Sequence, residues 1–543
     1  MTVILDGATL TSADVLRVSR PGPDGGFAPV ALGADASAAI AATRAYIDAE
    51  WMHDGAPMMY GFNTGVGLFK DTRVSVDDIP RYQVTMILAH ATGVGEPLPE
   101  DVVRATMVLR ANAFASNYSG PGLEVVERLL AFLNAGLHPV MPAKGSVGAS
   151  GDLAPLAYVA AALAGFAEAE IVFKGRRMPA PEAIAAAGLP PTVELGAKDA
   201  SALINGSTVS LALAVLAAAD ARRVLRHADV ALALTCEAMR AEVTAFDPRI
   251  HAARPQSGQI RCAENVRRLL RGSGRTTEAA RQIVFPEERR DPAVPLTPRI
   301  QDVYSLRCAP HVHGPVIDAL DYIDRIVGIE INSATDNPLI FAREGGGHEV
   351  LSGGNFHGQY LAQATDLLAI ALADLGSISE RRLARLIDPN MSFGLPRNLN
   401  AGKRGLNTGF PTVQCSMSAL VMENRTLATP GSVDSVPGKG NSEDHVSNST
   451  WCARKARTVV ANTEQIVAVE LLMAAQALSL VEPLAEAFPL APATRAAMAA
   501  LRDTIPPALD GDRWWHADMA AALALVQAGS VLAAAEGVAG PLN

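Results

Sequence analysis

This sequence contains few aromatic residues and few charged residues, and both shortages narrow the possible classes of protein. Aromatic residues make up 5% of the 543 residues and charged residues 19%, whereas hydrophobic residues reach 49%. A chain of this composition can bury a large core, which excludes a disordered protein. Alanine and leucine outnumber tyrosine, phenylalanine and tryptophan, which favours helices. We therefore expect a globular, mainly all-α protein.

Cysteine and positive charge are also scarce. The 5 cysteines show no Cys-x-x-Cys spacing, so the sequence indicates neither a disulfide framework nor a zinc ribbon. Lysines and arginines number 46 against 56 aspartates and glutamates, which gives a formal net charge of −10. A nucleic acid or an anionic membrane would therefore need a local basic patch. Arginines cluster only at Arg267, Arg268, Arg271 and Arg275, which we interpret as a solvated loop or a subunit contact.

Long uninterrupted apolar runs are absent as well. The N-terminal MTVILDGATL reaches Asp6 before an apolar segment of signal-peptide length can develop, and no run has the length of a membrane span. We expect a soluble, cytoplasmic protein that binds neither nucleic acid nor membrane.

Helical patterns dominate the chain after a mixed N-terminal region. Residues 1–35 predict short strands and turns, because the glycine- and proline-rich PGPDGG interrupts any helical period. Long apolar periodicities over residues 358–388 and 446–482 predict helices of a multi-helix bundle. The sequence thus divides into an N-terminal region, residues 1–200, which carries two glycine-rich loops, and a long-helix bundle, residues 201–543.

The first glycine-rich loop comprises residues 60–67, and the second is Lys144-Gly-Ser-Val-Gly-Ala-Ser-Gly-Asp152. The second loop is followed directly by the apolar segment LAPLAYVAAALAG. Asp152 and Pro155 stand where first-turn acids and early prolines are favoured, so a helix is expected to begin here. Two common glycine-loop motifs do not fit, because no lysine occupies the phosphate-loop position and Asp152 replaces the last glycine of a Gly-x-Ser-x-Gly nucleophile elbow.

Ala149-Ser150-Gly151, inside GSVGASGDLAPLAY, resembles the sequence that cyclises to the 4-methylidene-imidazol-5-one (MIO) prosthetic group in the aromatic amino-acid ammonia-lyase and aminomutase family. In this reaction the Gly151 nitrogen attacks the Ala149 carbonyl in a tight turn that larger side chains would obstruct, and Ser150 then loses water. The resemblance implies the long-helix bundle of the fumarase and aspartase type, no external cofactor, no metal, and a homotetramer whose subunits share active sites.

Further strings similar to active-site segments of this family follow along nearly the whole chain. They are Tyr60 in YGFNTGVG, Asn205 in LINGS, Gln301, Tyr304 and Arg307 in QDVYSLRC, Asn337 in SATDNPLIF, Phe356 in LSGGNFHG, and Glu443 in NSEDHV. Each position taken alone also fits a structural role, such as a packed aromatic ring, an ion pair or an acid at a helix start.

The resemblance implies a role for most of these residues. Eliminating ammonia needs an electrophile for the amine and a base for the β-proton, and an ordinary tyrosine, with a pKa of roughly 10, is a base only where donors or positive potential favour its phenolate. Tyr60 is the expected base. Arg307 would bind the substrate carboxylate with its planar fork. Asn205 would hold the ring and the substrate, and Tyr304 and Gln301 would line the ring and the carboxylate end.

The pair Ala89-His90 in MILAHATGVGEPL stands where family members often differ with their substrate. His90 matches the histidine-type residue, and Glu443 resembles the histidine-type acid, where phenylalanine and tyrosine enzymes more often carry glutamine. A carboxylate and an imidazole can both hydrogen-bond a substrate imidazole, but a plain phenyl ring would leave them unpaired. We therefore expect elimination of ammonia from an aromatic L-amino acid, with L-histidine giving urocanate. Alternatives are a tyrosine-type ammonia-lyase or 2,3-aminomutase, since some carry histidine at this position, and a catalytically silent scaffold.

Several positions depart from the usual family pattern: Ala89, Val66, Ser442, Lys70 and Pro411. Lys70 adds a cation just after the loop of residues 60–67, YGFNTGVG, which we call the tyrosine loop. There it would either face the substrate or lie in solvent. Outside the family pattern, His311-x-His313 could suggest a metal, but no third ligand stands at a recognisable spacing, which favours a structural role.

Overall fold

The computed structural model describes residues 1–282, 300–438, 442–481 and 487–543. Helices form most of these residues, and the strands among them form small sheets of two or three strands. The prediction of a mainly all-α protein is confirmed. The chain forms two compact units: unit 1 comprises residues 1–217, 323–366 and 430–454, and unit 2 comprises residues 218–322, 367–429 and 455–543.

The two units alternate along the chain, unlike the continuous regions 1–200 and 201–543 into which the sequence divides. The chain changes unit at five places, one of which follows Thr429. The other four lie within long helices: α9 (Thr208–Ala238), α14 (Ala309–Glu330), α15 (Gln359–Leu386) and α17 (Ser449–Leu480). A boundary inside a continuous helix has no linker and no change of composition to mark it. The sequence alone therefore does not indicate this arrangement.

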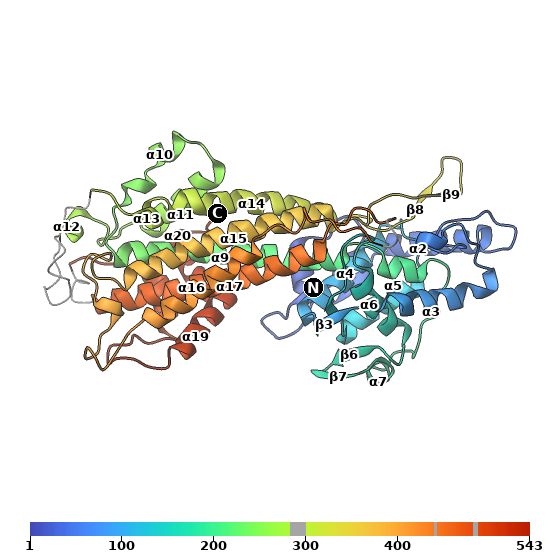
Figure 1. The fold of residues 1–543 in the computed structure, drawn as a ribbon, viewed down its shortest axis with the longest axis horizontal. Coiled ribbons are helices and arrows are strands. Elements are labelled where there is room, and N and C mark those ends of the chain that lie inside the picture. The colour runs from blue at the N-terminus through green and yellow to red at the C-terminus, as the bar shows by residue number, and fades with distance from the viewer. Residues whose placement is uncertain (283–299, 439–441, 482–486) are drawn as a thin grey trace. The chain divides into compact units, whose positions relative to one another are not determined.

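Unit 1 combines short helices with small sheets. Its helices are α1 (Ser12–Ser19), α2 (Ala34–Glu50), α3 (Ile79–His90), α4 (Glu100–Ala115), α5 (Leu123–Ala135), α6 (Leu153–Ala164), α7 (Ala180–Ala186) and α8 (Asp199–Ile204), with 3-10 turns η1 (Gly67–Phe69) and η2 (Val76–Asp78). Residues 102–115 of α4 are all buried, so this helix forms the centre of the core. Figure 1 shows α3, α4, α5 and α6 gathered beside one another.

The strands of unit 1 are short and pair over their few residues. β1 (Val3–Leu5) and β2 (Val30–Leu32) are parallel, with Val3 opposite Val30. The other pairs are antiparallel: β3 (Val94–Pro97) with β5 (Pro142–Lys144), β4 (Leu137–Pro139) with β6 (Glu170–Phe173), β6 with β7 (Arg176–Pro179), and β8 (Leu339–Ala342) with β9 (His348–Leu351).

Helix α1 corrects the prediction that residues 1–35 hold strands and turns only. Thr11 caps this helix by accepting a hydrogen bond from the Asp14 backbone, and the Asp14 side chain accepts one from the Thr11 backbone. This capping box satisfies two helix-end donors that would otherwise lack partners. The Thr-x-x-Asp spacing was the signal that could have predicted the helix.

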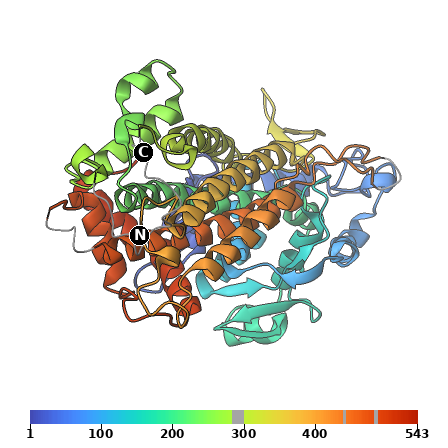
Figure 2. The same cartoon turned by 60° about the vertical axis from the view of Figure 1, so that its left-hand side comes forward.

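Unit 2 is a bundle around the long helices. Its other elements are η3 (Val243–Phe246), α10 (Pro248–Ala252), α11 (Ser257–Leu269), α12 (Glu278–Arg281), α13 (Tyr304–Arg307), η5 (Arg397–Leu399), α16 (Pro411–Leu427), α18 (Pro492–Arg502), α19 (Trp515–Ala528) and α20 (Ser530–Ala539). Figures 1 and 2 show the long helices running side by side with α16. Arg382 of α15 and Glu470 of α17 form a fully buried ion pair in this bundle, 2.5 Å between Nε and Oε1.

Both predicted long helices exist with slightly shorter bounds. Helix α15 covers 359–386 of the expected 358–388, and α17 begins at Ser449 because Asn448, with φ +55°, turns the chain before it. The expected last residue, 482, lies outside the described residues. By length and composition alone both helices could cross a membrane, but 56% and 78% of their apolar stretches are buried inside the structure.

Candidate active site

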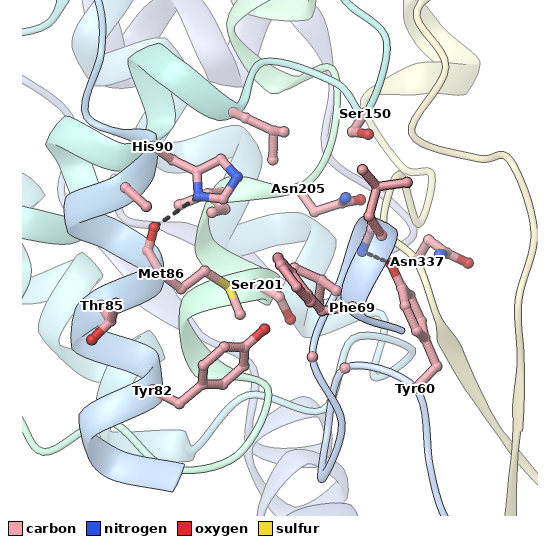
Figure 3. Close-up of a pocket in the computed structure, with 18 of the residues that line it drawn as sticks. Tyr60, Phe69, Tyr82, Thr85, Met86, His90, Ser150, Ser201, Asn205 and Asn337 are labelled. Carbon is pink, nitrogen blue, oxygen red and sulfur yellow. Dashed lines mark hydrogen bonds between the residues drawn. The ribbon is translucent and has the colours of Figure 1, made fainter. Parts of the chain in front are cut away.

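A cavity of about 710 Å³ lies within unit 1, and most of the residues singled out in the sequence line it (Figure 3). Its walls come from the tyrosine loop, α3, the Ala149-Ser150-Gly151 turn, the end of α8 and two short segments later in the chain. The predicted residues among its lining are Tyr60, Val66, Ala89, His90, Ser150, Asn205, Asn337, Ser442 and Glu443. Residues separated by nearly 400 positions of sequence therefore share one cavity.

The Ala149-Ser150-Gly151 turn is held by glycines that no larger residue could replace. Gly151 has φ +72°, a conformation that side chains disfavour, and a Cβ atom added to it would lie 2.1 Å from the carbonyl carbon of Gly206. The backbones of Gly151 and Gly206 pair as a short parallel bridge, and the Asp152 amide donates to the Gly206 carbonyl at 2.8 Å. The turn is thus compact and lies directly against the backbone of Gly206.

The buried side chain of Asp152 holds the end of this turn through hydrogen bonds. Its carboxylate is fully buried and accepts hydrogen bonds from the Ser210 amide at 2.7 Å, the Ser146 hydroxyl at 2.9 Å and the Thr450 hydroxyl at 2.5 Å. Burial raises the pKa of Asp152, and these hydrogen bonds oppose the rise. Helix α6 begins right after it, as predicted, but the Asp152 side chain does not cap that helix.

Tyr60 is half-buried on the cavity wall, and the Gly67 amide donates a hydrogen bond to its Oη at 3.4 Å. The amide belongs to the first residue of η1, so the loop itself supplies this donor. Figure 3 shows a second phenol, Tyr82, on the opposite wall, where burial raises its pKa and nearby Tyr60 adds to the rise. Tyr82 was not predicted from the sequence.

His90 lies at the end of α3 and has a defined hydrogen bond. Its Nδ1 is 2.7 Å from the Met86 carbonyl oxygen, which can only accept, so Nδ1 donates the proton. In a neutral ring, Nε2 is then a hydrogen-bond acceptor. Ala89 and Met86 line the cavity beside it.

Asn205 follows the last residue of α8 and presents an unused acceptor. Its side-chain oxygen is buried and has no hydrogen-bond partner among the residues that the structure describes, whereas its backbone carbonyl accepts from Arg110 at 2.7 Å. A buried polar atom without a partner carries a desolvation cost, so a group that donates to it would bind favourably.

Glu443 reaches the turn directly. Its Oε1 accepts a hydrogen bond of 2.7 Å from the Ser150 hydroxyl. Asn337 completes this side of the cavity, and its side-chain oxygen accepts from the Gly353 amide at 2.8 Å.

The remaining predicted residues do not line this cavity. Gln301, Tyr304 and Arg307 belong to unit 2, where the Arg307 guanidinium lies 4.7 Å from the centre of the Tyr304 ring. Phe356 belongs to unit 1 and is half-buried, but it is not among the lining residues. Among the departures, Pro411 is the first residue of α16 in unit 2, and Lys70 is exposed and pairs with Asp71 at 3.4 Å. Lys70 therefore lies in solvent rather than in the cavity.

The His311-x-His313 motif has partners that its spacing did not indicate. Nδ1 of His313 lies 2.7 Å from Oδ1 of Asp229, and the ligand atoms of Asp229, Cys262 and His313 all lie within 4.8 Å of one another. Asn265 donates to the other Asp229 oxygen at 2.8 Å, and burial raises the pKa of the Cys262 thiol. Hydrogen bonds thus use both Asp229 oxygens and Nδ1 of His313, whereas buried Nε2 of His313 has no hydrogen-bond partner within the described part of the chain.

The arginine cluster is not a solvated loop, which corrects that interpretation. Arg267, Arg268 and Arg275 each donate to backbone carbonyls of unit 2 (Phe246, Ala539 and Phe488), and Arg275 is 2% exposed. These side chains close helix and loop ends instead of forming an open basic patch.

Comparisons with known proteins agree on one family. The family described as "Aromatic amino acid lyase" matches residues 10–503. A histidine ammonia-lyase of Alkaliphilus oremlandii is 43% identical over 534 residues, 98% of each chain. The solved structure of histidine ammonia-lyase from Trypanosoma cruzi has a TM-score of 0.86 at 36% identity and covers 99% of this chain and 96% of its own. Tyrosine aminomutase from Streptomyces globisporus has a TM-score of 0.89 at 34% identity, with 100% of both chains covered.

Proposed function

Because this chain belongs to the aromatic amino acid lyase family, we propose that it eliminates ammonia from L-histidine to give urocanate. One observation carries the choice of substrate: His90, Glu443 and Ser150 line the same cavity, with Glu443 bonded to Ser150. Two groups that can bind an imidazole thus lie beside the residue that would become the electrophile.

Ala149, Ser150 and Gly151 fit the MIO group. The φ of +72° at Gly151 and its close contact with Gly206 give the compact turn that a small ring at this place would require. When formed, MIO supplies an electrophilic carbon that makes the substrate amine a better leaving group. No external cofactor is proposed.

Tyr60 is proposed as the base that takes the β-proton at Oη. The Gly67 amide would stabilise negative charge on that oxygen, and the loop fixes the ring beside the cavity. Arg307 is proposed to bind the substrate carboxylate, with Tyr304 and Gln301 near it and Phe356 at the substrate. These four roles rest on the resemblance of their sequence segments, as does the proposed homotetramer with shared active sites.

His90 and Glu443 are proposed to select the imidazole. Neutral His90 offers Nε2 as an acceptor to an imidazole N–H, and the Glu443 carboxylate accepts a second such bond. Phenylalanine offers no side-chain donor to either group, so it would gain neither hydrogen bond.

A second candidate is a tyrosine-type lyase or 2,3-aminomutase. Tyr82, Thr85 and Ser201 add hydroxyl groups to the wall of the cavity, and these could bind a phenolic oxygen. A silent scaffold is the third possibility, but it has no need of Tyr60 and the intact Ala149-Ser150-Gly151 turn. We also propose that the protein is cytoplasmic and that it binds no nucleic acid, membrane or metal.

The test is a product assay of the purified enzyme with histidine, tyrosine, phenylalanine and dihydroxyphenylalanine. Ultraviolet absorbance detects the conjugated acid, and chromatography detects any β-amino acid. Urocanate from histidine supports the proposal. Turnover of a phenolic substrate with none of histidine would keep the chemistry and reject the specificity, and a β-amino acid product would identify a mutase.

A further inference from the structure

A buried ion pair lies behind the cavity without taking part in the proposed chemistry. Nζ of Lys198 is 2.6 Å from Oδ2 of Asp336, and both side chains are 0% exposed. Removing two charges from water is costly, and a pair of this kind is a poor source of stability compared with apolar residues of similar size. Its presence therefore calls for another explanation.

The pair joins three segments that carry residues of the cavity. Lys198 directly precedes α8, and Asn205 directly follows that helix. Asp336 directly precedes Asn337, and its Oδ1 accepts a 2.6 Å hydrogen bond from the Asn337 amide. Both oxygens of one carboxylate are thus used, one on the lysine and one on the backbone of a cavity residue.

The third segment is the tyrosine loop. A Cβ atom added to Gly61, the residue after Tyr60, would lie 3.8 Å from Cδ of Lys198 and 3.4 Å from Cδ of Pro338. The loop backbone therefore passes close to the lysine side chain and to the proline that follows Asn337, about one methyl group away from contact.

A second buried cation extends the arrangement to the Ala149-Ser150-Gly151 turn. Arg110 donates to the Asn205 carbonyl and is attracted by the charge of Asp336. Gly206, which pairs with Gly151, has no room for a side chain, because an added Cβ would lie 2.3 Å from the Thr335 carbonyl oxygen. Burial lowers the pKa of Lys198 and of Arg110, and Asp336 opposes both shifts.

We propose that Lys198 and Asp336 are positioning residues of the active site, whose ion pair holds the tyrosine loop, α8 and the segment before β8 at fixed distances around the cavity. The inference rests on the proposed function. Lys198 is itself held in a left-handed conformation, φ +73°, which a lysine adopts only where its surroundings enforce it. Misplacing a reacting group by about 1 Å can reduce turnover about 100-fold, so the pair would act on rate through geometry.

The test compares the full-length enzyme with the double variant Lys198→Met/Asp336→Leu. Apolar residues of similar size keep the core filled, but Arg110 loses the attraction of Asp336 and the Asn337 amide loses its acceptor, so the melting temperature should fall. Kinetics are therefore measured well below the melting temperature of the variant. We expect kcat for histidine to fall about 100-fold while KM changes less than about threefold. Intact mass should also show that fewer chains lose two waters, since the turn rests on Gly206.

The control replaces a partly buried pair of unit 2, Arg223→Met/Glu464→Leu, whose partners are 2.7 Å apart and whose side chains are 21% and 6% exposed. This control should retain the kcat and the complete water loss of the wild type. A folded Lys198→Met/Asp336→Leu protein with complete water loss and unchanged kcat would overturn the inference.

Lys198→Arg decides the question if the double variant does not fold. Arginine keeps the charge but places it on a broader, planar group. A tenfold or larger loss of kcat at unchanged KM supports positioning, and wild-type kcat rejects it. Wild-type enzyme that neither loses two waters nor deaminates histidine would instead reject the proposed function.

Discussion

The Ser150 hydroxyl donates a 2.7 Å hydrogen bond to Glu443, a residue 293 positions later in the chain. The bond connects the proposed source of the electrophile with the acid proposed to bind the imidazole. If Ser150 loses its oxygen as water during cyclisation, this oxygen of Glu443 loses that donor. Formation of the prosthetic group would thereby prepare Glu443 to accept a hydrogen bond from the substrate.

Ser150→Ala should prevent formation of MIO, because alanine has no hydroxyl to leave as water. We expect the intact mass to equal that of the encoded chain and turnover of histidine to be abolished. The melting temperature should change little, since one hydrogen bond contributes about 1 kcal/mol. Ser416→Ala, at an exposed serine of α16, is the matched control and should retain both water loss and turnover. Rapid turnover by Ser150→Ala would contradict the assignment.

Glu443→Gln should weaken the selection of histidine. A hydrogen bond to a charged group contributes about 1.5–3 kcal/mol, so kcat/KM for histidine should fall about 10- to 150-fold. Phenylalanine makes no such bond, and its kcat/KM should not fall with that of histidine. Steady-state kinetics with both substrates measure the difference.

The control for this change is Asp444→Asn, which alters an exposed neighbouring acid. Equal losses for histidine and phenylalanine in Glu443→Gln would place Glu443 outside substrate selection. A loss in Asp444→Asn as large as in Glu443→Gln would show that the local charge, not the contact, matters.

Periodic and local features of the fold were predictable from the sequence. The apolar periods of α15 and α17 and the glycine-rich loop before α6 are signals that act within a few turns of chain. Tyr82 was predictable too, although it was missed. Tyr82, Met86 and His90 are spaced by four residues and so share one face of α3.

Contacts between distant segments were not predictable from spacing. Nothing near Ser150 in sequence indicates that Glu443 accepts its hydrogen bond, and nothing near Lys198 indicates Asp336 as its partner. These contacts depend on how long helices return the chain to unit 1, which a single sequence does not encode as a local pattern. The resemblance of motifs predicted the candidate residues of the site, and the fold determines which of them line the same cavity.

Tyr60→Phe should separate formation of the prosthetic group from catalysis. Removing Oη deletes the proposed base, and loss of general base catalysis reduces kcat by about 10²- to 10⁴-fold. The turn of Ala149, Ser150 and Gly151 is unchanged, so the loss of two waters should remain complete. Intact mass and steady-state rates measure the two effects independently.

Tyr360→Phe is the control, since this tyrosine of α15 is 65% exposed. It should behave as the wild type in both measurements. Wild-type kcat in Tyr60→Phe would assign the base to another residue, with Tyr82 the nearest phenol to examine.

His138 should make the fold sensitive to acid. It is 8% exposed, its Nε2 accepts a hydrogen bond from Arg104 at 3.0 Å, and its Nδ1 lies 3.4 Å from Glu100. Burial and the Arg104 charge lower the pKa of His138 to about 4. A histidine in the unfolded chain has a pKa of roughly 6.5. Between about pH 4 and 6.5, His138 is therefore mostly protonated in the unfolded state and mostly neutral in the folded state.

His138 therefore contributes stability that is fully present above about pH 6.5 and is lost as the pH falls toward about 4. The loss amounts to at most roughly 3.5 kcal/mol, because each pKa unit corresponds to about 1.4 kcal/mol. His138→Gln keeps an acceptor for Arg104 but does not titrate, so its melting temperature should fall less over this range. His53→Gln, at an exposed histidine, should follow the wild type. Parallel curves of melting temperature against pH for wild type and His138→Gln would show that other groups cause the acid sensitivity.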